Sequence, residues 1–512
     1  MFRYPKPLIR SLWLLAAVIL SSAAYFAVLS LWQPQTERDP SSIFAMKGEQ
    51  SRLAALSFVR GKQAKTAALD VNALNHYQPA AAGEGARTAM VHLFEWTWPA
   101  VAAECENFLG PQGYAAVQVS PPTAHRVMDD SPDWATPGYW RHSWAQRYQS
   151  VRFDSLTSRS GDIYSFTDMV DRCAAVGVDI YVDAVINHTT GAGAGTDTAS
   201  DGSTFTASTV KSEINFPQFG PQDFHDDCPN GINFGNEWEV QNCWLSGLLD
   251  LDTSDDYVQQ TLADYMNWMM SLGVKGFRID ASKHMASGDI GGIISRLDTA
   301  TYGTPYIFQE VIDMGGDEPI KAWHYYNNGD VTDFEYGKHV NNIVRYGDIQ
   351  NFGQAARHDS SKAVVFTDNH DNQRGHGAGS YDSNSVPGVL TFYSDAEAYK
   401  MGNIAMLAWP YGYPKVMSSY DWLRNIQYKD GKMQDLHDWI GPPSDTQGQT
   451  NAAQCFNPLD GNWDNLGASG GWVCEHRWRE IANMVGFRNA VNDCQDVTDW
   501  QSENNVLAFG RC

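Results

Sequence analysis

The sequence lacks several patterns that would assign it to common functional classes. None of its eight cysteines forms a Cys-x-x-Cys pair, the usual signature of zinc ribbons and thioredoxin-like redox proteins. Basic residues are few: 36 Lys and Arg stand against 60 Asp and Glu, a net charge of -24, which disfavours nucleic acid and anionic membrane surfaces as partners. No GxGxxG fingerprint follows the first predicted strand, where Trp96-Thr97-Trp98-Pro99 stands instead, and this disfavours a dinucleotide-dependent enzyme.

Charged residues are also absent from residues 11–36, which are mostly apolar between Leu12 and Trp32. Three basic residues precede this run, namely Arg3, Lys6 and Arg10. The run is longer than the ~7 to 15 apolar residues of a cleaved signal peptide and close to the ~20 that span a bilayer. Residues 1–32 therefore predict an export signal, either cleaved or retained as a signal anchor. Both alternatives place the rest of the chain outside the cell, where the even number of cysteines favours disulfides.

The chain after this signal divides into a loosely patterned lead-in, residues 33–85, and a long αβ region, residues 86–491. In the αβ region, short β-rich runs are each followed by a helix-like stretch. The eight predicted strands are Val91–Trp96, Tyr114–Val119, Val178–Ile186, Val274–Ile279, Tyr306–Ile312, Val331–Phe334, Ala363–Phe366 and Ile404–Ala408. They predict an α/β fold, a closed (β/α)8 TIM barrel, with an open doubly wound sheet as the alternative.

The third and fourth predicted strands are separated by residues 187–273, which is far longer than an ordinary connection between a strand and a helix. We interpret residues 188–248 as an inserted domain between strand 3 and helix 3, above the mouth of the barrel.

Carboxylates lie at the ends of several predicted strands, where the reactive face of such a barrel lies. Side chains alternate along a strand, so Arg278 and Asp280 point the same way, and the guanidinium is expected to lower the pKa of Asp280 and keep it ionised as a nucleophile. Glu310 follows an apolar run, where burial favours the protonated carboxyl of a proton donor. Asp371, after the seventh strand, is a third carboxylate that could hold ring hydroxyls. Two carboxylates of unlike environment facing one cleft suit glycoside cleavage.

Six segments resemble, in order and spacing, the signature segments of α-amylases, especially the animal-type, chloride-dependent branch. They are VHLFEW, VQVSPP, DAVINH, GFRIDASKHM, FQEVID and DNHDNQRGHGAG, and the resemblance runs from about Thr88 to Arg511. It implies endo-hydrolysis of α-1,4-glucosidic bonds in starch and glycogen with retention of configuration. By motif, it implies Asp280 as the nucleophile, Glu310 as the general acid/base and Asp371 as the transition-state stabiliser.

The resemblance also implies the residues that bind the substrate. We assign this role to Trp144, Tyr148, Asp183, His188, Arg278, Lys283, His284 and His370. Tyr148 is expected to stack beneath the sugar at the cleavage site, whereas Lys283 and His284 reach sugars on the leaving side. Trp144 fits a core role and a stacking role equally, because Ala145 stands where the family often has a second tryptophan.

Calcium and chloride are implied as cofactors. Calcium is expected to join the barrel to the inserted domain through oxygen ligands from Asn187, Gln241, Asp250 and His284, with Gln241 and His284 contributing backbone carbonyls. Chloride is expected between Arg278, Asn369 and Lys415. The third chloride position is often arginine, and because Lys415 offers one point charge rather than a fork, we expect weaker anion binding.

The resemblance further implies disulfides between Cys105 and Cys173, Cys228 and Cys243, and Cys455 and Cys474, with Cys494 and Cys512 left to pair. Residues 492–512 resemble the start of a truncated C-terminal β-domain. We expect a monomer that takes α-glucan polysaccharide as substrate, either extracellular or membrane-anchored with its catalytic domain outside. Two alternatives remain at this stage: a non-catalytic sugar-binding relative, and an enzyme that mainly transfers glucosyl units.

Overall fold

The computed structural model describes residues 87–128, 142–347, 349–445, 448–455, 471–503 and 505–511. The predicted signal or anchor segment, 1–32, and the lead-in, 33–85, lie outside these residues, as does Cys512. In the described part of the chain, no helix combines the length and the apolar character needed to cross a bilayer.

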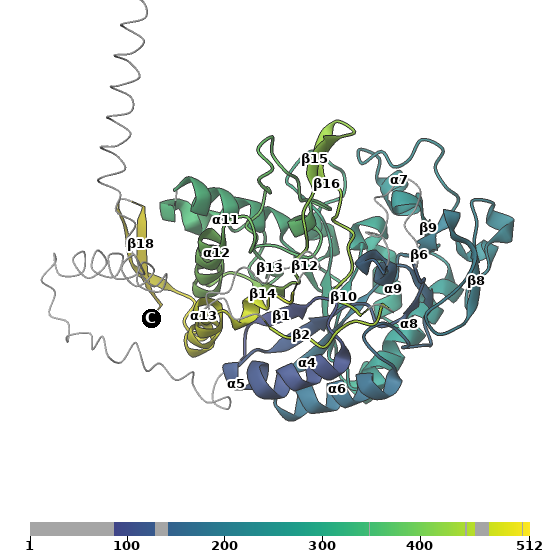
Figure 1. The fold of residues 1–512 in the computed structure, drawn as a ribbon, viewed down its shortest axis with the longest axis horizontal. Coiled ribbons are helices and arrows are strands. Elements are labelled where there is room, and N and C mark those ends of the chain that lie inside the picture. The colour runs from purple at the N-terminus through teal and green to yellow at the C-terminus, as the bar shows by residue number, and fades with distance from the viewer. Residues whose placement is uncertain are drawn as a thin grey trace, which may run out of the picture. The chain divides into compact units, whose positions relative to one another are not determined.

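Eight parallel strands close into a barrel, as predicted (Figure 1). In chain order they are β1 (Met90–Leu93), β2 (Ala116–Val119), β5 (Asp179–Ala184), β10 (Gly276–Ile279), β11 (Tyr306–Gln309), β12 (Asp330–Thr332), β13 (Ala363–Val365) and β14 (Tyr413–Ser418). The barrel closes where β1 pairs with β14, with Met90 opposite Lys415. Almost every residue of these strands is buried, as expected for a parallel sheet covered by helices.

Helices follow most of the strands and surround the barrel (Figure 1). They are α4 (Trp98–Glu104), α5 (Gly110–Gln112), α6 (Ile163–Ala175), α8 (Asp256–Ser271), α9 (Ser287–Ile294), α10 (Thr299–Tyr302), α11 (Phe334–Tyr346), α12 (Ala396–Ala408) and α13 (Arg479–Ala490). Several begin at an aspartate, because its carboxylate accepts the free N–H groups of the first turn. Asp255, for example, accepts from Tyr257 and Val258 at the start of α8.

The predicted position of the eighth strand is wrong. Residues 404–408 form the last part of α12, and the eighth strand is β14, Tyr413–Ser418. The buried residues of α12 are Tyr399, Gly402, Asn403, Met406 and Leu407, which is the spacing of one helical face. The sequence pattern did not predict β14 because the strand contains Pro414 and the charged Lys415, both of which are untypical of a central strand.

The segment between β5 and α8 holds small elements of its own. They are β6 (His188–Gly191), β7 (Gly195–Thr198), β8 (Thr204–Ala207), α7 (Glu237–Asn242) and β9 (Leu248–Asp250). β6 pairs with β9 and places His188 opposite Asp250, while β7 and β8 form a separate hairpin. A disulfide joins Cys228 to Cys243, at the end of α7. This segment therefore returns to the barrel beside the residues that follow β5.

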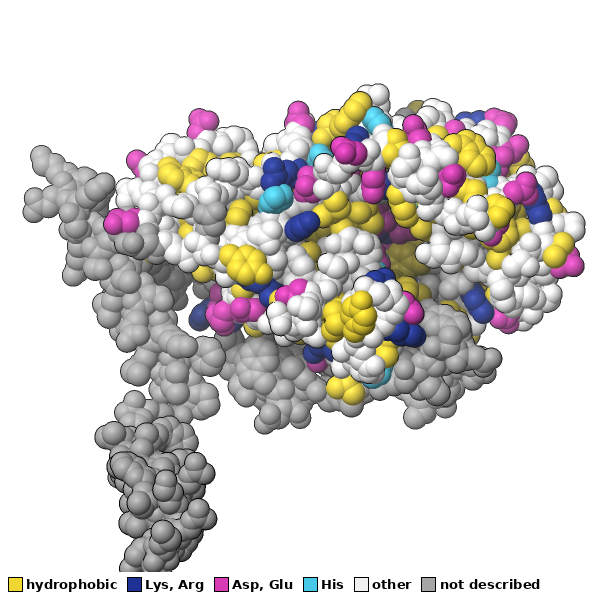
Figure 2. All heavy atoms as spheres, turned by 90° about the horizontal axis from the view of Figure 1, so that it is seen from above, with side chains coloured by type: hydrophobic (Ala, Val, Ile, Leu, Met, Phe, Trp, Pro, Cys, Tyr) yellow, Lys and Arg dark blue, Asp and Glu magenta, His cyan; other side chains and the backbone are white. Residues whose placement is uncertain are grey.

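The remaining strands form short antiparallel pairs. They are β3 (Ala124–His125) with β4 (Ser150–Arg152), β15 (Ile426–Lys429) with β16 (Lys432–Asp435), and β17 (Val497–Glu503) with β18 (Val506–Arg511). Two further disulfides pair Cys105 with Cys173 and Cys455 with Cys474, and Cys494 is also disulfide-bonded. Acidic and basic side chains are interspersed on the face seen in Figure 2, where neither sign forms one continuous patch.

Candidate active site

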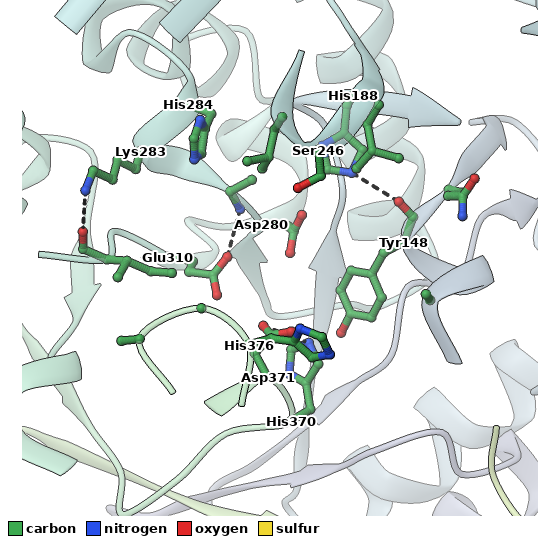
Figure 3. Close-up of a pocket in the computed structure, with 18 of the residues that line it drawn as sticks. Tyr148, His188, Ser246, Asp280, Lys283, His284, Glu310, His370, Asp371 and His376 are labelled. Atoms are coloured by element: carbon green, nitrogen blue, oxygen red, sulfur yellow. Dashed lines mark hydrogen bonds and ion pairs between the residues drawn. The ribbon is translucent and has the colours of Figure 1, made fainter. Parts of the chain in front are cut away.

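A cavity of about 750 Å³ lies at the carboxyl ends of the barrel strands. Its lining includes Asp280, which follows β10, Glu310, which follows β11, and Asp371, which follows β13. Figure 3 shows these carboxylates on different sides of one space, with histidines above and below them. Residues far apart in the sequence are thus brought to one site by the common direction of the strands.

Arg278, on β10, links the carboxylates from beneath the cavity. Its Nη1 lies 2.5 Å from Asp183 Oδ1 and 2.7 Å from Asp280 Oδ1. Its Nη2 lies 2.7 Å from Glu310 Oε1. The guanidinium is 1% exposed, so these charges interact with little screening by water.

The predicted direction of the Asp280 pKa is wrong. Burial raises the pKa of Asp280 well above its ordinary value, and Arg278 opposes this shift without overcoming it. Burial is the largest cause, and the negative charges of Glu310 and Asp183 add to the upward shift. Burial likewise raises the pKa of Asp371 to about 6, with the negative charge of Glu310 adding to the effect.

The carboxyl of Glu310 is also held by the backbone next to Asp280. The N–H of Ala281 donates to Glu310 Oε2 at 3.0 Å (Figure 3). Ala281 adopts the left-handed conformation, with φ 48° and ψ 31°, which is uncommon for a residue with a Cβ atom. This turn directs the chain away from β10 and points the N–H at Glu310. The carboxyl of Glu310 is therefore fixed relative to Asp280 through one peptide unit.

Tyr148 and His370 form one wall of the cavity. Their rings stack with centroids 5.0 Å apart and planes inclined by 14°. The Tyr148 hydroxyl donates to Asp183 Oδ2 at 2.9 Å, which fixes the ring against the cluster of charges. His188 Nε2 lies 3.1 Å from the backbone carbonyl of Tyr148, to which it donates. Burial lowers the pKa of His188 to about 4, so its ring is neutral at neutral pH.

Lys283 and His284 lie together on the opposite side. Lys283 Nζ donates to the carbonyl of Ile312 at 2.7 Å and forms an ion pair with Glu318. His284 Nδ1 donates to the carbonyl of Val240 at 2.9 Å, which connects the turn after β10 to α7. Burial lowers the pKa of His284 to about 4. Both side chains line the cavity, so they can act on a bound ligand as hydrogen-bonding groups.

Trp144 is almost fully buried and also lines the cavity. It is 3% exposed, its Nε1 donates to the carbonyl of Asp438 at 2.9 Å, and its ring stacks on Trp439 with centroids 5.1 Å apart. Trp439 and His376 also line the cavity, and sequence reasoning missed both. The signal for His376 was its position in the HGAG run after Asp371, but Trp439 follows the β15–β16 hairpin and carries no strand-end signal.

Asp183 and Arg278 do not line the cavity, contrary to the prediction that they bind substrate. Asp183 is fully buried, and its carboxylate is satisfied by Arg278, Tyr148 and Gln118. The interior of a barrel lies behind its mouth, so side chains within the strands stay below the residues that follow them. Both residues therefore support the cavity from beneath.

The predicted calcium residues are brought close together in pairs. Asn187 Nδ2 donates to Asp250 Oδ1 at 3.0 Å, while α7, which contains Gln241, is joined to His284 through Val240. The buried Asn187 Oδ1 makes no hydrogen bond with described residues. Burial raises the pKa of Asp250 to about 7, although His225 Nδ1, 2.7 Å from Asp250 Oδ2, opposes this shift. Among described residues there is no group of three or more His, Cys, Asp and Glu that could hold a metal. A set of one carboxylate and neutral oxygens fits calcium better than zinc.

Two of the predicted chloride residues lie on barrel strands, Arg278 on β10 and Lys415 on β14, and Asn369 follows β13. Arg278, Asn369 and Lys415 are all buried, and Arg278 Nη2 has no well-formed hydrogen bond within the described chain. Burial lowers the pKa of Lys415 to about 7, and the positive charge of Arg278 adds to this shift. Arg278 and Lys415 are buried positive groups whose repulsion favours an anion beside them. The side chains present therefore fit a halide.

Comparison with known proteins places this site in a family. The model of the α-amylase catalytic domain matches residues 131–374. An α-amylase from Oryzias latipes is 46% identical over 446 residues, which cover 83% of this chain and 81% of the relative. The chain belongs to the α-amylase family. It is therefore a glycoside hydrolase, and a pancreatic α-amylase from Sus scrofa is similar to it at 42% identity over 448 residues, 84% of this chain and 81% of the relative.

The fold of this α-amylase is also similar to that of a solved relative. α-Amylase I from Eisenia fetida, in a mutant complex with maltohexaose, superposes with a TM-score of 0.72 at 39% identity and covers 85% of this chain and 84% of that one. A γ-cyclodextrin glucanotransferase from Bacillus clarkii, at 16% identity and a TM-score of 0.55, shares the fold alone.

Proposed function

We propose that this α-amylase is an exported endo-acting enzyme that hydrolyses α-1,4-glucosidic bonds in starch and glycogen by a retaining double displacement. The observation that carries the proposal is the convergence of Asp280, Glu310 and Asp371 on one cavity. Asp280 and Glu310 both contact the same guanidinium, which keeps them close together. Retaining enzymes need their two carboxyl groups about 5 to 5.5 Å apart, because one carboxylate attacks directly and no water lies between.

Each carboxylate has a distinct role in this mechanism. Glu310 protonates the glycosidic oxygen while Asp280 attacks the anomeric carbon, so the leaving chain departs and a covalent glucosyl ester forms. Glu310, now ionised, then removes a proton from water, which attacks the same carbon and releases Asp280. Asp371 stabilises the positive charge that develops on the sugar ring in both steps. Tyr148 supports the ring, and Lys283 and His284 bind the leaving sugars.

The stereochemistry of the first product tests the mechanism. Purified enzyme is incubated with a maltoheptaoside whose non-reducing end is blocked, and the anomeric protons are followed by nuclear magnetic resonance. We expect the α-anomer to appear first and to mutarotate later. Initial release of the β-anomer would overturn the retaining mechanism, and an absence of release would overturn endo-hydrolysis.

The raised pKa of Asp371 predicts an acidic limit to activity. Its folded pKa of about 6 lies above its ordinary value, so the ionised form that stabilises the transition state is lost as pH falls through about 6. We expect kcat/KM on a soluble maltooligosaccharide to decline below that pH, with the protein still folded by circular dichroism. A flat profile from pH 7 to pH 4.5 would contradict this assignment.

Calcium is proposed to bind Asn187, Asp250 and the backbone carbonyls of Gln241 and His284. When bound, the ion supplies positive charge that favours ionised Asp250 and ties the inserted segment to the turn after β10. We expect exhaustive chelation to lower the midpoint of thermal unfolding by several degrees, because ligand binding stabilises only the folded state. The isosteric variant Asp250→Asn should unfold at a lower temperature than the parent and respond less to chelation. Equal responses in both proteins would remove Asp250 from the site.

Chloride is proposed to bind Arg278, Asn369 and Lys415. When bound, the anion supplies negative charge beside Glu310, which favours the protonated carboxyl needed for the first step. Arg278 would then be shared between the anion and three carboxylates. Removal of halide is expected to lower activity at neutral pH.

An extracellular location is proposed from the predicted export signal and from the disulfides of the described chain. The substrate is an α-glucan, and the net charge of -24 does not hinder binding of this neutral polymer. We propose a monomer, either free or tethered by residues 1–32. Sequencing the N-terminus of the mature protein decides between these two forms.

A further inference from the structure

A glutamine inside the barrel joins two of the charged groups described above. Gln118 lies on β2 and is fully buried. Its Nε2 donates to Asp183 Oδ2 at 3.2 Å, and its Oε1 accepts from Lys415 Nζ at 3.2 Å. The amide of Gln118 therefore donates to a negative group and accepts from a positive group at the same time. A hydrocarbon side chain can do neither, and a carboxylate cannot donate.

Asp183 connects Gln118 to Tyr148, which lines the cavity, and to Arg278. The same Oδ2 atom that accepts from Gln118 also accepts from the Tyr148 hydroxyl, while Oδ1 contacts Arg278. Tyr148 lines the cavity, and Arg278 contacts both Asp280 and Glu310. A displacement of Asp183 would therefore move the ring beneath the sugar and the cation between the reacting carboxylates together.

Lys415 depends on the same amide. Lys415 Nζ donates a hydrogen bond to Gln118 Oε1. The ammonium also lies over the rings of Phe308 and Phe366, at 5.5 and 5.1 Å from their centroids. The charged and titratable groups that influence Lys415 come from several elements of the barrel. They are His92, Asp183, Arg278, Glu310 and Asp371. A neutral acceptor holds Lys415 in place without neutralising its charge.

We propose that Gln118 is a positioning residue of the active site, whose amide sets Asp183 and Lys415 relative to each other and so fixes Arg278 and Tyr148. This role rests on the proposed function, because it presupposes that Asp280, Glu310 and Tyr148 act on the substrate. Gln118 touches neither the cavity nor the reacting atoms, so its loss acts through geometry. The expected signature is a loss of kcat rather than of substrate affinity, because misplaced reacting groups weaken the transition state more than the ground state.

Gln118→Met tests this inference because it removes both hydrogen bonds at nearly constant volume. We expect kcat on maltoheptaoside to fall about 10-fold with KM changed less than about twofold. In chloride-free buffer, calorimetric titration with sodium chloride should show several-fold weaker binding than in the parent. Gln118→Glu keeps an acceptor for Lys415 but turns a carboxylate toward Asp183, so it should lose more kcat than the methionine variant.

Gln309→Met is the matched control. Gln309 is also a fully buried barrel glutamine, but its Nε2 donates to the backbone carbonyls of Tyr325 at 3.0 Å and Asp330 at 3.3 Å rather than to a charged side chain. Its variant should keep the parental kcat, pH profile and chloride affinity even if it unfolds earlier. Parental kcat in folded Gln118→Met or Gln118→Glu would overturn the inference, as would equal losses in the Gln309 variant. An inactive parent would instead refute the proposed function, and a parent without chloride binding would refute only its halide component.

Discussion

Glu310→Gln is expected to hydrolyse maltoheptaoside with a kcat lower by about 10³- to 10⁴-fold, since general acid-base catalysis contributes up to about this much. The amide keeps the size of the carboxyl and can still accept the N–H of Ala281, so the fold should be retained. It can neither protonate the leaving oxygen nor activate water. The measurement is steady-state release from the blocked oligosaccharide, with thermal unfolding as the check on folding.

The leaving group separates this role from a merely structural one. α-Maltosyl fluoride needs no proton donor, because fluoride departs as an anion, so the first fluoride released per molecule of Glu310→Gln, measured before steady state, should appear at a rate much closer to that of the parent. Steady-state turnover should stay slow, because the variant still lacks the base that activates water. Glu335→Gln, on α11, is the control because Glu335 does not line the cavity. A loss of this initial fluoride release as large as the loss on the oligosaccharide would contradict the assignment of Glu310 as the proton donor.

Asp280→Asn is expected to be at least as damaging, with kcat lower by about 10⁴-fold or more, since it removes the group that forms the covalent intermediate. The variant also loses the charge that faces Arg278 at 2.7 Å, so the guanidinium then contacts only Asp183 and Glu310. Neutralising one of three buried carboxylates lowers their mutual repulsion, and we expect the unfolding temperature to be unchanged or higher.

The fluoride substrate distinguishes the two variants. Asp280→Asn should remain inactive on α-maltosyl fluoride, because an improved leaving group does not replace a nucleophile. Recovery on this substrate in Asp280→Asn, and none in Glu310→Gln, would exchange the two assigned roles. The comparison of the two variants therefore tests which carboxylate is the proton donor and which is the nucleophile.

The sequence predicted the barrel strands well where an apolar β-rich run is followed directly by a polar motif. β5, β10 and β11 each carry an apolar β-rich run that ends in a polar motif, so their ends could be located from local pattern. β14 could not, because its Lys415 is stabilised inside the barrel by Gln118, a residue almost 300 positions earlier. A charged residue within a strand is understandable only when its partner on another strand is known.

Properties of the active site that depend on contacts between distant residues could not be predicted from the sequence either. The positions of Asp280, Glu310 and Asp371 after their strands followed from the barrel geometry, but the balance between burial and charge at Asp280 did not. That balance depends on the depth of burial and on the neighbouring charges of Glu310 and Asp183, which are set by the tertiary structure. Trp439 was missed for a related reason, since its place beside Trp144 arises from tertiary packing rather than from a motif.

The closure of the barrel between β1 and β14 constrains how this enzyme is made. Met90 finds its partner Lys415 only after more than three hundred intervening residues have been synthesised. Contacts of such long range form slowly, and until they form the edges of the open sheet are exposed to other chains. A nascent chain paused before β14 therefore has an open barrel, and hydrolytic activity is expected only after β14 has been synthesised.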